Sequence, residues 1–175
     1  LRYHNNGILI SSKTANHDNP KLNCRINGLE NYSPLILIID KNLSINVNLK
    51  LFNNKKKIYI FYNKKNFKKY KILRKMGVNL IKINLININM DFDQIFKKIK
   101  KKKINHLLVE GGRKLTDYLL RNNYFNEFYL FKSPIKLKKL GKNNILAIIN
   151  KLGKHFKNKK KISTYLSNDE LIHYK

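Results

Sequence analysis

Short apolar runs alternate with longer helical patterns through the first two thirds of the 175-residue chain. The runs are rich in Ile, Leu and Val, a composition typical of strands that are covered on both faces. The pattern predicts an α/β fold with a mostly parallel central sheet and flanking helices, because parallel strands need helical crossovers. The predicted strands are Gly7–Ser11, Leu35–Asp40, Lys57–Tyr62, Val78–Ile83 and Ile104–Glu110.

Three segments between and after these strands have near-helical apolar spacing. Their apolar positions are Phe67, Tyr70, Leu73 and Met76, then Phe92, Ile95, Phe96 and Ile99, and finally Leu115, Tyr118 and Leu119. Gly77 follows the first segment where a left-handed cap is expected. Asp91–Lys100 has acidic residues early and lysines late, as the helix dipole prefers. The third helix is predicted to end near Asn122.

After the third helix the pattern changes to strands without helices. Glu127–Phe131, Lys161–Leu166 and Glu170–Tyr174 are predicted as strands, with a hairpin turn at residues 167–169. We expect them to add antiparallel strands to the sheet. No repeat or flexible linker interrupts the chain, so residues 1–175 are predicted to form one domain. Residues 1–4 resemble the tail of a helix, and we expect the domain to be truncated at its N-terminal edge.

The formal net charge of +28 indicates either a polyanionic partner or a general compositional bias. Lysines are spread from Lys13 to Lys175 and accompany abundant Asn, Ile, Tyr and Phe, the residues that an A/T-rich coding sequence favours. We therefore expect no nucleic-acid partner as the primary function. A basic nucleic-acid-binding module stays open as an alternative.

Cysteine and histidine content restricts the chemistry further. Cys24 is the only cysteine, which excludes an internal disulfide and a Cys-pair metal site. The five histidines lack metal-ligand spacing, so no metal is expected. The longest aliphatic runs, residues 35–39 and 145–149, are about a quarter of the ~20 residues that a membrane-spanning helix needs. We expect a cytoplasmic protein that does not enter a membrane.

The polar segment Ser11–Arg25 directly follows the first predicted strand and contains a turn-forming Asp-Asn-Pro. Ligands of open α/β sheets bind beyond the carboxyl ends of the strands, so this loop is in the right place to supply site residues. The alternative is a polar connection with an Asx-turn at Asp18.

A second candidate segment runs from the strand end at Glu110 through Gly111 and Gly112 into the third helix. Bare backbone N–H groups at a helix start can bind a phosphate, and glycine allows close approach. The alternative is a tight turn without a ligand. The chain has neither a G-x-G-x-x-G nor a P-loop motif. We expect this turn and the first polar segment to converge on one cleft.

Residues 8–25 have the pattern apolar strand, Ser-Ser-x-Thr, three residues, Asp-x-Pro-x-Leu-x-x-Arg. This pattern closely resembles the reductase domain of the riboflavin-biosynthesis deaminase/reductase family. Leu107-Leu108-Val109-Glu110-Gly111-Gly112, followed by Leu115 and Leu119-Leu120, resembles the family's second hallmark. Ile38-Ile39-Asp40 and Asn126-Glu127-Phe128 resemble two further pieces, so the similarity spans nearly the whole chain. The family's opening strand and loop, roughly Lys-x-Ala-x-Ser-Leu-Asp-Gly, and its Trp-Ile segment are not in this sequence.

The resemblance implies a dihydrofolate-reductase-like fold and NADPH as the hydride donor. It implies reduction of 5-amino-6-(5-phosphoribosylamino)uracil to 5-amino-6-(5-phosphoribitylamino)uracil. It also implies pairing of reductase domains into a homo-oligomer, and a zinc deaminase domain N-terminal to this one in the full-length protein. Another dihydrofolate-reductase-like oxidoreductase is the alternative enzyme, although the loop motif and the Glu-Gly-Gly turn argue against it.

The resemblance also assigns residues to roles. The positions that match substrate contacts are Arg2, Leu22, Arg25 and Glu110. The positions that match cofactor contacts are Thr14, Asp18, Lys41, Gly112, Arg113, Lys114, Leu115, Thr116, Asp117 and Tyr118. At Lys41 the family often has a small hydroxyl residue, and at Arg113 a small residue or proline. Arginine suits a substrate phosphate. Glu110 is the candidate catalytic residue, and we favour a role in orienting the substrate over one in proton transfer.

Overall fold

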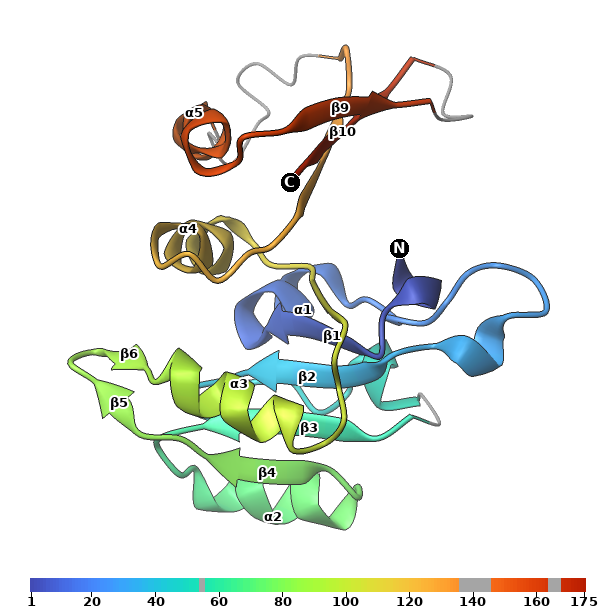
Figure 1. Ribbon diagram of the computed structural model, residues 1–175. Coiled ribbons are helices and arrows are strands. Elements are labelled where there is room, and N and C mark those ends of the chain that lie inside the picture. The colour runs from blue at the N-terminus through green and yellow to red at the C-terminus, as the bar shows by residue number, and fades with distance from the viewer. Residues whose placement is uncertain (54–55, 136–145, 164–167) are drawn as a thin grey trace. The chain divides into compact units, whose positions relative to one another are not determined.

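The computed structural model describes residues 1–53, 56–135, 146–163 and 168–175 (Figure 1). The chain divides into two compact units, residues 1–112 and residues 113–175. Each unit has its own sheet.

The first unit is built on a five-stranded parallel sheet in the order β4-β3-β2-β1-β7. The strands are β1 (Gly7–Ser11), β2 (Leu35–Ile39), β3 (Ile58–Tyr62), β4 (Asn79–Lys82) and β7 (Leu107–Val109). All five predicted strands are thus confirmed, with β7 shorter than expected. In the register of the sheet, Leu9 of β1 lies between Leu37 and Val109. Because β1 has a partner on each side, the segments that follow β1, β2 and β7 begin at the same edge of the sheet.

Two predicted helices of this unit are confirmed, and so is the left-handed cap predicted at Gly77, which has a φ of 77°. α2 (Phe67–Lys75) begins after Asn66, whose side chain accepts a hydrogen bond from Lys69 N. α3 (Phe92–Lys100) begins after Asp91, which caps it in the same way. Alternate residues of the strands face the two sides of the sheet. Ile8, Ile36 and Ile60 pack with Leu73 of α2 in one core cluster, and α3 crosses in front of the strands in Figure 1.

Residues 12–18 form a helix, α1 (Ser12–Asp18), where we expected a polar loop, with an Asx-turn at Asp18 as the alternative. Ser11 ends β1 and caps this helix by accepting a hydrogen bond from Thr14 N. Asn19 ends it in a left-handed conformation, with φ 43° and ψ 53°. The prediction missed α1 because only Ser12 and Ala15 are buried, so the helix shows almost no apolar periodicity.

Short elements complete the first unit. The 3₁₀ turns are η1 (Arg2–His4), η2 (Glu30–Tyr32) and η3 (Lys50–Asn53). η1 is a single turn at the position where we expected the tail of a helix. The hairpin of β5 (Leu85–Ile86) and β6 (Asn89–Met90) was not predicted. Its tip exposes Ile86 and Ile88, which are 57% and 77% accessible.

The second unit contains α4 (Arg113–Arg121), β8 (Phe128–Lys132), α5 (Leu146–His155), β9 (Lys159–Ile162) and β10 (Glu170–Tyr174). Its strands pair in the antiparallel order β8-β10-β9. Its core contains Leu120 of α4, Leu152 of α5 and Tyr174 of β10. The antiparallel C-terminal strands are confirmed, and so is the α/β fold class.

Two details of the second unit differ from expectation. In the described residues its strands pair with one another and not with the parallel sheet. α5 was also missed: its apolar residues were considered only as a run too short to span a membrane, whereas Ile148 and Leu152, four positions apart, bury one helical face. The expected strand at 161–166 is observed at 159–162. Residues 164–166 of the expected strand and Ser167 lie outside the described residues.

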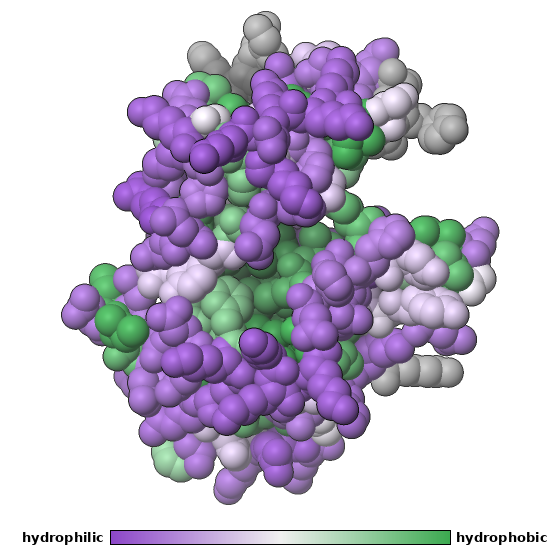
Figure 2. All heavy atoms as spheres, viewed as in Figure 1, coloured by the Kyte–Doolittle hydropathy of each residue, from purple (hydrophilic) through white to green (hydrophobic). Residues whose placement is uncertain are grey.

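Hydrophilic residues cover most of the face seen in Figure 2, over both units. This distribution agrees with a charge that is spread along the whole sequence. Among the helices that the structure describes, none has both the length and the apolar character needed to cross a lipid bilayer.

Candidate active site

Asp40, directly after β2, organises the sheet edge where the two candidate segments begin. Its carboxylate is 1% accessible and accepts hydrogen bonds from Ser12 Oγ (3.0 Å), from Ser44 N and Oγ (2.9 Å each) and from Ile45 N (2.9 Å). A buried carboxylate needs such partners, and a fully bonded network is rigid. Asp40 therefore fixes the start of α1 against the segment that follows β2.

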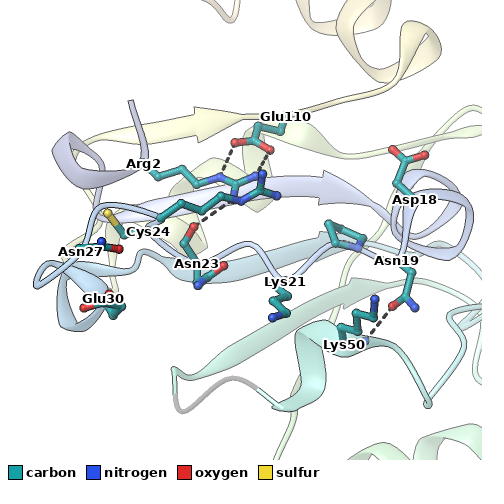
Figure 3. A pocket seen from close by; sticks show the side chains of 12 residues that line it. Arg2, Asp18, Asn19, Lys21, Asn23, Cys24, Asn27, Glu30, Lys50 and Glu110 are labelled. Atoms are coloured by element: carbon teal, nitrogen blue, oxygen red, sulfur yellow. Dashed lines mark hydrogen bonds and ion pairs between the residues drawn. The ribbon is translucent and has the colours of Figure 1, made fainter.

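Glu110 extends β7 by one residue, because its backbone N–H donates to Leu9 O at 3.0 Å. Its carboxylate is bound by Arg2 in a fork, with Nε to Oε1 and Nη2 to Oε2 both at 2.8 Å (Figure 3). Arg2 Nη1 donates in addition to the backbone carbonyl of Asn23 at 2.9 Å. The hydrogen bond to Glu110 raises the pKa of the Arg2 guanidinium above its ordinary value. One arginine thus joins η1, the end of β7 and the segment after α1.

An open pocket of about 740 Å³ lies beside this ion pair, a volume within the range of small-molecule sites. Its lining residues all belong to the first unit: Arg2, Asp18, Asn19, Pro20, Lys21, Asn23, Cys24, Arg25, Asn27, Glu30, Lys50 and Glu110. Asp18 and Arg25 come from the first candidate segment and Glu110 from the second. The expected convergence of the two segments on one cleft is therefore confirmed for these three residues (Figure 3).

The twin-glycine turn also lies against α1. A Cβ atom placed on Gly112 would be 2.9 Å from Thr14 Oγ1, closer than real Cβ contacts allow. Thr14 Oγ1 is itself 2.9 Å from Ser11 Oγ, in a hydrogen bond that holds the hydroxyl in place. Glycine at this position lets the backbone approach the first turn of α1. Thr14 and Gly112 are not among the residues that line the pocket.

The pocket is polar and carries charges of both signs. Arg2 forms an ion pair with Glu110. The other cationic side chains that line the pocket, Lys21, Arg25 and Lys50, are exposed. Asp18 contacts His17 Nδ1 at 2.6 Å. The side-chain oxygen of Asn23 is buried and has no hydrogen-bond partner. This set of groups suits a polar ligand that carries both hydrogen-bond donors and an anionic group.

The remaining candidates lie elsewhere. The side chain of Leu22 is fully buried in the core of the first unit, with a left-handed backbone at φ 57°, and it does not line the pocket. Lys41 Nζ donates to Ile88 O at 2.7 Å, at the tip of the β5–β6 hairpin. Arg113, Lys114, Leu115, Thr116, Asp117 and Tyr118 are the first residues of α4, in the second unit.

Within α4, Asp117 has partners in its own unit. Its carboxylate binds Lys151 Nζ of α5 at 2.8 Å and Arg121 Nε at 2.9 Å. The hydrogen bond from Lys151, followed by that from Arg121, lowers the pKa of Asp117 below its ordinary value. Leu115 is buried.

Eight of the twelve pocket-lining residues were not named as site residues from the sequence, among them Asn19, Asn23 and Lys50. Asn19 Oδ1 accepts a hydrogen bond from Lys50 N at 2.8 Å and so ties η3 to the end of α1. A signal for Asn19 existed, because asparagine is the residue other than glycine that most often takes a left-handed helix cap. Lys50 had none, since it is one of many lysines in a segment without a motif. Among the described residues, no cluster of three or more His, Cys, Asp or Glu side chains could hold a metal ion.

A parallel α/β unit with a polar pocket at the carboxyl ends of its strands is the architecture of a small-molecule-binding or catalytic domain. Residues 1–164 match the family model described as the RibD C-terminal domain. The chain belongs to this family.

Curated relatives agree with the family match. The chain is 28% identical over 134 residues to the riboflavin biosynthesis protein RibD of Aquifex aeolicus, covering 77% of this chain and 36% of that protein. It is 26% identical over 140 residues to the RibD protein of Chlamydia pneumoniae, covering 78% and 37%. The chain thus spans little more than a third of the length of these relatives.

Solved structures show the same fold, the dihydrofolate-reductase-like fold of RibD reductase domains. Acinetobacter baumannii RibD superposes with a TM-score of 0.72 at 16% identity, covering 99% of this chain and 47% of that one. A Thermotoga maritima protein described as a diaminohydroxyphosphoribosylaminopyrimidine deaminase/5-amino-6-(5-phosphoribosylamino)uracil reductase gives 0.68 at 16% identity, covering 98% and 45%. A pyrimidine reductase-like protein from Corynebacterium diphtheriae gives 0.66 at 14% identity, covering 99% and 77%.

Proposed function

We propose that this chain is the reductase part of an enzyme of riboflavin biosynthesis. The reaction is the NADPH-dependent reduction of 5-amino-6-(5-phosphoribosylamino)uracil to 5-amino-6-(5-phosphoribitylamino)uracil. The observation that carries the proposal is the shared pocket of Asp18, Arg25 and Glu110, because these residues lie far apart in the sequence and match separate family motifs. The family match over residues 1–164 supports it, and since the match spans both compact units we propose that they serve as one domain.

The turn at Gly112 fits a phosphate-bearing cofactor. Its backbone approaches Thr14 so closely that a Cβ atom on Gly112 would clash, and a glycine turn before a helix start lets a phosphate come close to the backbone. Membership of the family implies a nicotinamide cofactor in general, and its phosphorylated form, NADPH, is our proposal. The residues that would hold it are Thr14, Asp18, Lys41 and residues 112–118. The reduced nicotinamide would supply a hydride to the anomeric carbon of the ribose.

Glu110 is suited to orienting the substrate. Each of its carboxylate oxygens accepts one hydrogen bond from Arg2, and an ionised carboxylate has about four acceptor sites. Two sites remain for N–H groups of a pyrimidine or hydroxyls of a ribose. The clamp also fixes the direction of these sites, which favours positioning over proton donation.

Arg2 and Arg25 have different parts in this proposal. Arg2 uses three of its five N–H donors on Glu110 and on the carbonyl of Asn23, so it acts first as a positioning residue and has two donors left for substrate. Arg25 is exposed at the pocket. Its planar guanidinium is the group we assign to the substrate phosphate.

The proposal extends to the partners of the chain. We propose a zinc deaminase domain in the full-length protein, because the Thermotoga maritima relative is described as both a deaminase and a reductase. We also propose that the protein is cytoplasmic and that reductase domains associate as a homo-oligomer. Sedimentation of the full-length protein tests the association, which a purely monomeric species would contradict.

The function is tested by following NADPH absorbance in the presence of full-length protein and the deaminated pyrimidine riboside phosphate. We expect saturable NADPH consumption that depends on the pyrimidine. Omission of the pyrimidine and replacement by dihydrofolate are the controls. Consumption with dihydrofolate alone would favour a different reductase of the same fold, and no consumption with the pyrimidine would contradict the proposal.

A further inference from the structure

Lys50 lies in the pocket although it belongs to neither candidate segment. It begins η3, a 3₁₀ turn between β2 and β3, and is exposed at the pocket wall. Its backbone N–H donates to Asn19 Oδ1 at 2.8 Å (Figure 3). Lys50 is therefore bound to Asn19, the residue that ends α1. Asn19 directly follows Asp18 in the first polar segment.

Asn19 holds this attachment in a special backbone conformation. Its φ of 43° and ψ of 53° are left-handed, and its backbone N–H closes α1 by donating to Ala15 O at 3.0 Å. The left-handed turn ends the helix at the pocket, and the side chain continues from there to Lys50 N. One residue thus both terminates α1 and sets the start of η3.

The residues that line the pocket include more cationic than anionic side chains, and Lys50 is one of the cations. Arg2 and Glu110 neutralise one another, which leaves Lys21, Arg25 and Lys50 against Asp18 and Glu30. In Figure 3 Glu30 lies at the far end of the pocket from Lys50. Asp18 is directed to His17, at 2.6 Å. An anionic ligand group in this pocket would therefore be attracted to the exposed cations Arg25 and Lys50.

We infer that Lys50 binds the 5-phosphate of the substrate together with Arg25, and that Asn19 is the positioning residue for Lys50. This inference rests on the proposed function and adds a phosphate contact from a third segment of the chain. Arg25 offers a planar fork, whereas Lys50 offers a point charge on a flexible stem, and a phosphate dianion can use both. The site would then select the phosphorylated sugar over the free riboside.

The inference is tested by calorimetric titration of the full-length protein with ribose 5-phosphate and with ribose. Lys50→Gln is expected to weaken ribose 5-phosphate binding about tenfold, the size of one charge-assisted hydrogen bond, and to leave ribose binding unchanged. Lys71→Gln is the matched control, because Lys71 is an exposed lysine of α2 outside the pocket and its loss changes the net charge equally. An equal effect of both substitutions would overturn the inference in favour of general charge attraction.

Asn19→Gly separates positioning from folding. Glycine keeps the left-handed turn without strain and removes only the side-chain acceptor for Lys50 N. We expect about threefold weaker ribose 5-phosphate binding, and no further loss when Asn19→Gly is added to Lys50→Gln, because both changes remove the same interaction. Additive losses in the double variant would overturn the role of Asn19.

The same titrations distinguish failure of the inference from failure of the proposed function. Phosphate-selective binding that depends on Lys50, without NADPH consumption, would support the phosphate site and contradict the reductase. NADPH consumption with equal kcat/KM for phosphorylated and dephosphorylated substrates, in wild type and Lys50→Gln, would support the reductase and overturn the phosphate site.

Discussion

Arg2 and Glu110 stand 108 positions apart in the chain and meet in a two-bond ion pair, with both N–O distances at 2.8 Å. The guanidinium also binds the backbone carbonyl of Asn23 at 2.9 Å. Three segments of the chain therefore meet at one charged group. The orientation of Glu110 in the pocket depends on this arrangement.

Loss of the two-bond contact between Arg2 and Glu110 should weaken catalysis without unfolding the protein. Lysine can keep the charge in Arg2→Lys but cannot bind both carboxylate oxygens and the carbonyl of Asn23 at once. We expect kcat/KM to fall about tenfold, the cost of about one charge-assisted hydrogen bond. Steady-state kinetics with Arg121→Lys as control checks this. Arg121 is an exposed arginine of α4, and a comparable loss in both variants would contradict the specific role of Arg2.

Glu110→Gln should be more damaging than Arg2→Lys. The amide keeps the shape of the side chain but has one acceptor oxygen instead of two, and it places N–H donors against the guanidinium. We expect kcat/KM to fall about 10- to 100-fold while the protein stays folded. Glu30→Gln is the matched control, since Glu30 is the other glutamate of the same pocket. Full activity of Glu110→Gln would show that Glu110 has no role in the active site.

Gly112→Ala should weaken cofactor binding. The added Cβ would lie 2.9 Å from Thr14 Oγ1, whose hydroxyl is held by Ser11, so the turn has to move. We expect the Kd for NADPH to rise about tenfold or more, measured by fluorescence titration. Gly153→Ala in α5 is the control, because nothing lies within 4 Å of its added Cβ. There we expect unchanged binding and a gain of about 0.5–1 kcal/mol in stability, because alanine favours a helix interior.

The second unit should lose stability in acid through Asp117. Lys151 and Arg121 hold its pKa below the ordinary value of 3.8 in the folded protein. A carboxyl group with a lowered folded pKa stabilises the protein above its unfolded pKa, and this contribution disappears as the pH falls through the folded pKa. Urea denaturation at a series of pH values from about 6 to about 2 measures the free energy of unfolding across this range.

Asp117→Asn is expected to lower stability at neutral pH and to flatten the decline below about pH 4. Asp169→Asn, which removes an exposed carboxylate near β10, is the control and should keep the wild-type decline. An unchanged acid decline in Asp117→Asn would show that other carboxylates determine it.

The strands of the first unit could be predicted because their apolar residues are buried in continuous runs. Leu35–Ile39 and Ile58–Tyr62 agree with the expected ranges to within one residue at each end. The helices that begin after Asn66 and Asp91 could be predicted because apolar spacing and the glycine cap at Gly77 are both local signals.

The rest of the fold depends on non-local contacts. α1 is held by its Ser11 cap and by the hydrogen bond from Ser12 to Asp40, 28 positions away, so its own sequence looks like a loop. The separate C-terminal sheet depends on which strands pair, which the alternation of residues does not determine.

The candidate site could be predicted in part. Asp18, Arg25 and Glu110 were found through motifs and share the pocket. The bond between Arg2 and Glu110 could not be found in this way, because no local pattern connects two residues of such distant segments. Lys50 could not be found either, because its place in the pocket depends on contacts of the folded chain such as the bond to Asn19.

In the proposed reaction, this chain directs a hydride from NADPH to the ribose of a phosphoribosylaminopyrimidine. The most direct measurement supplies full-length protein with NADPH deuterated at the transferred position of the nicotinamide and determines the product mass. We expect a ribityl product that carries one deuterium at the former anomeric carbon, with far less product from Glu110→Gln. NADPH left unconsumed, or a product without deuterium at that carbon, would contradict it.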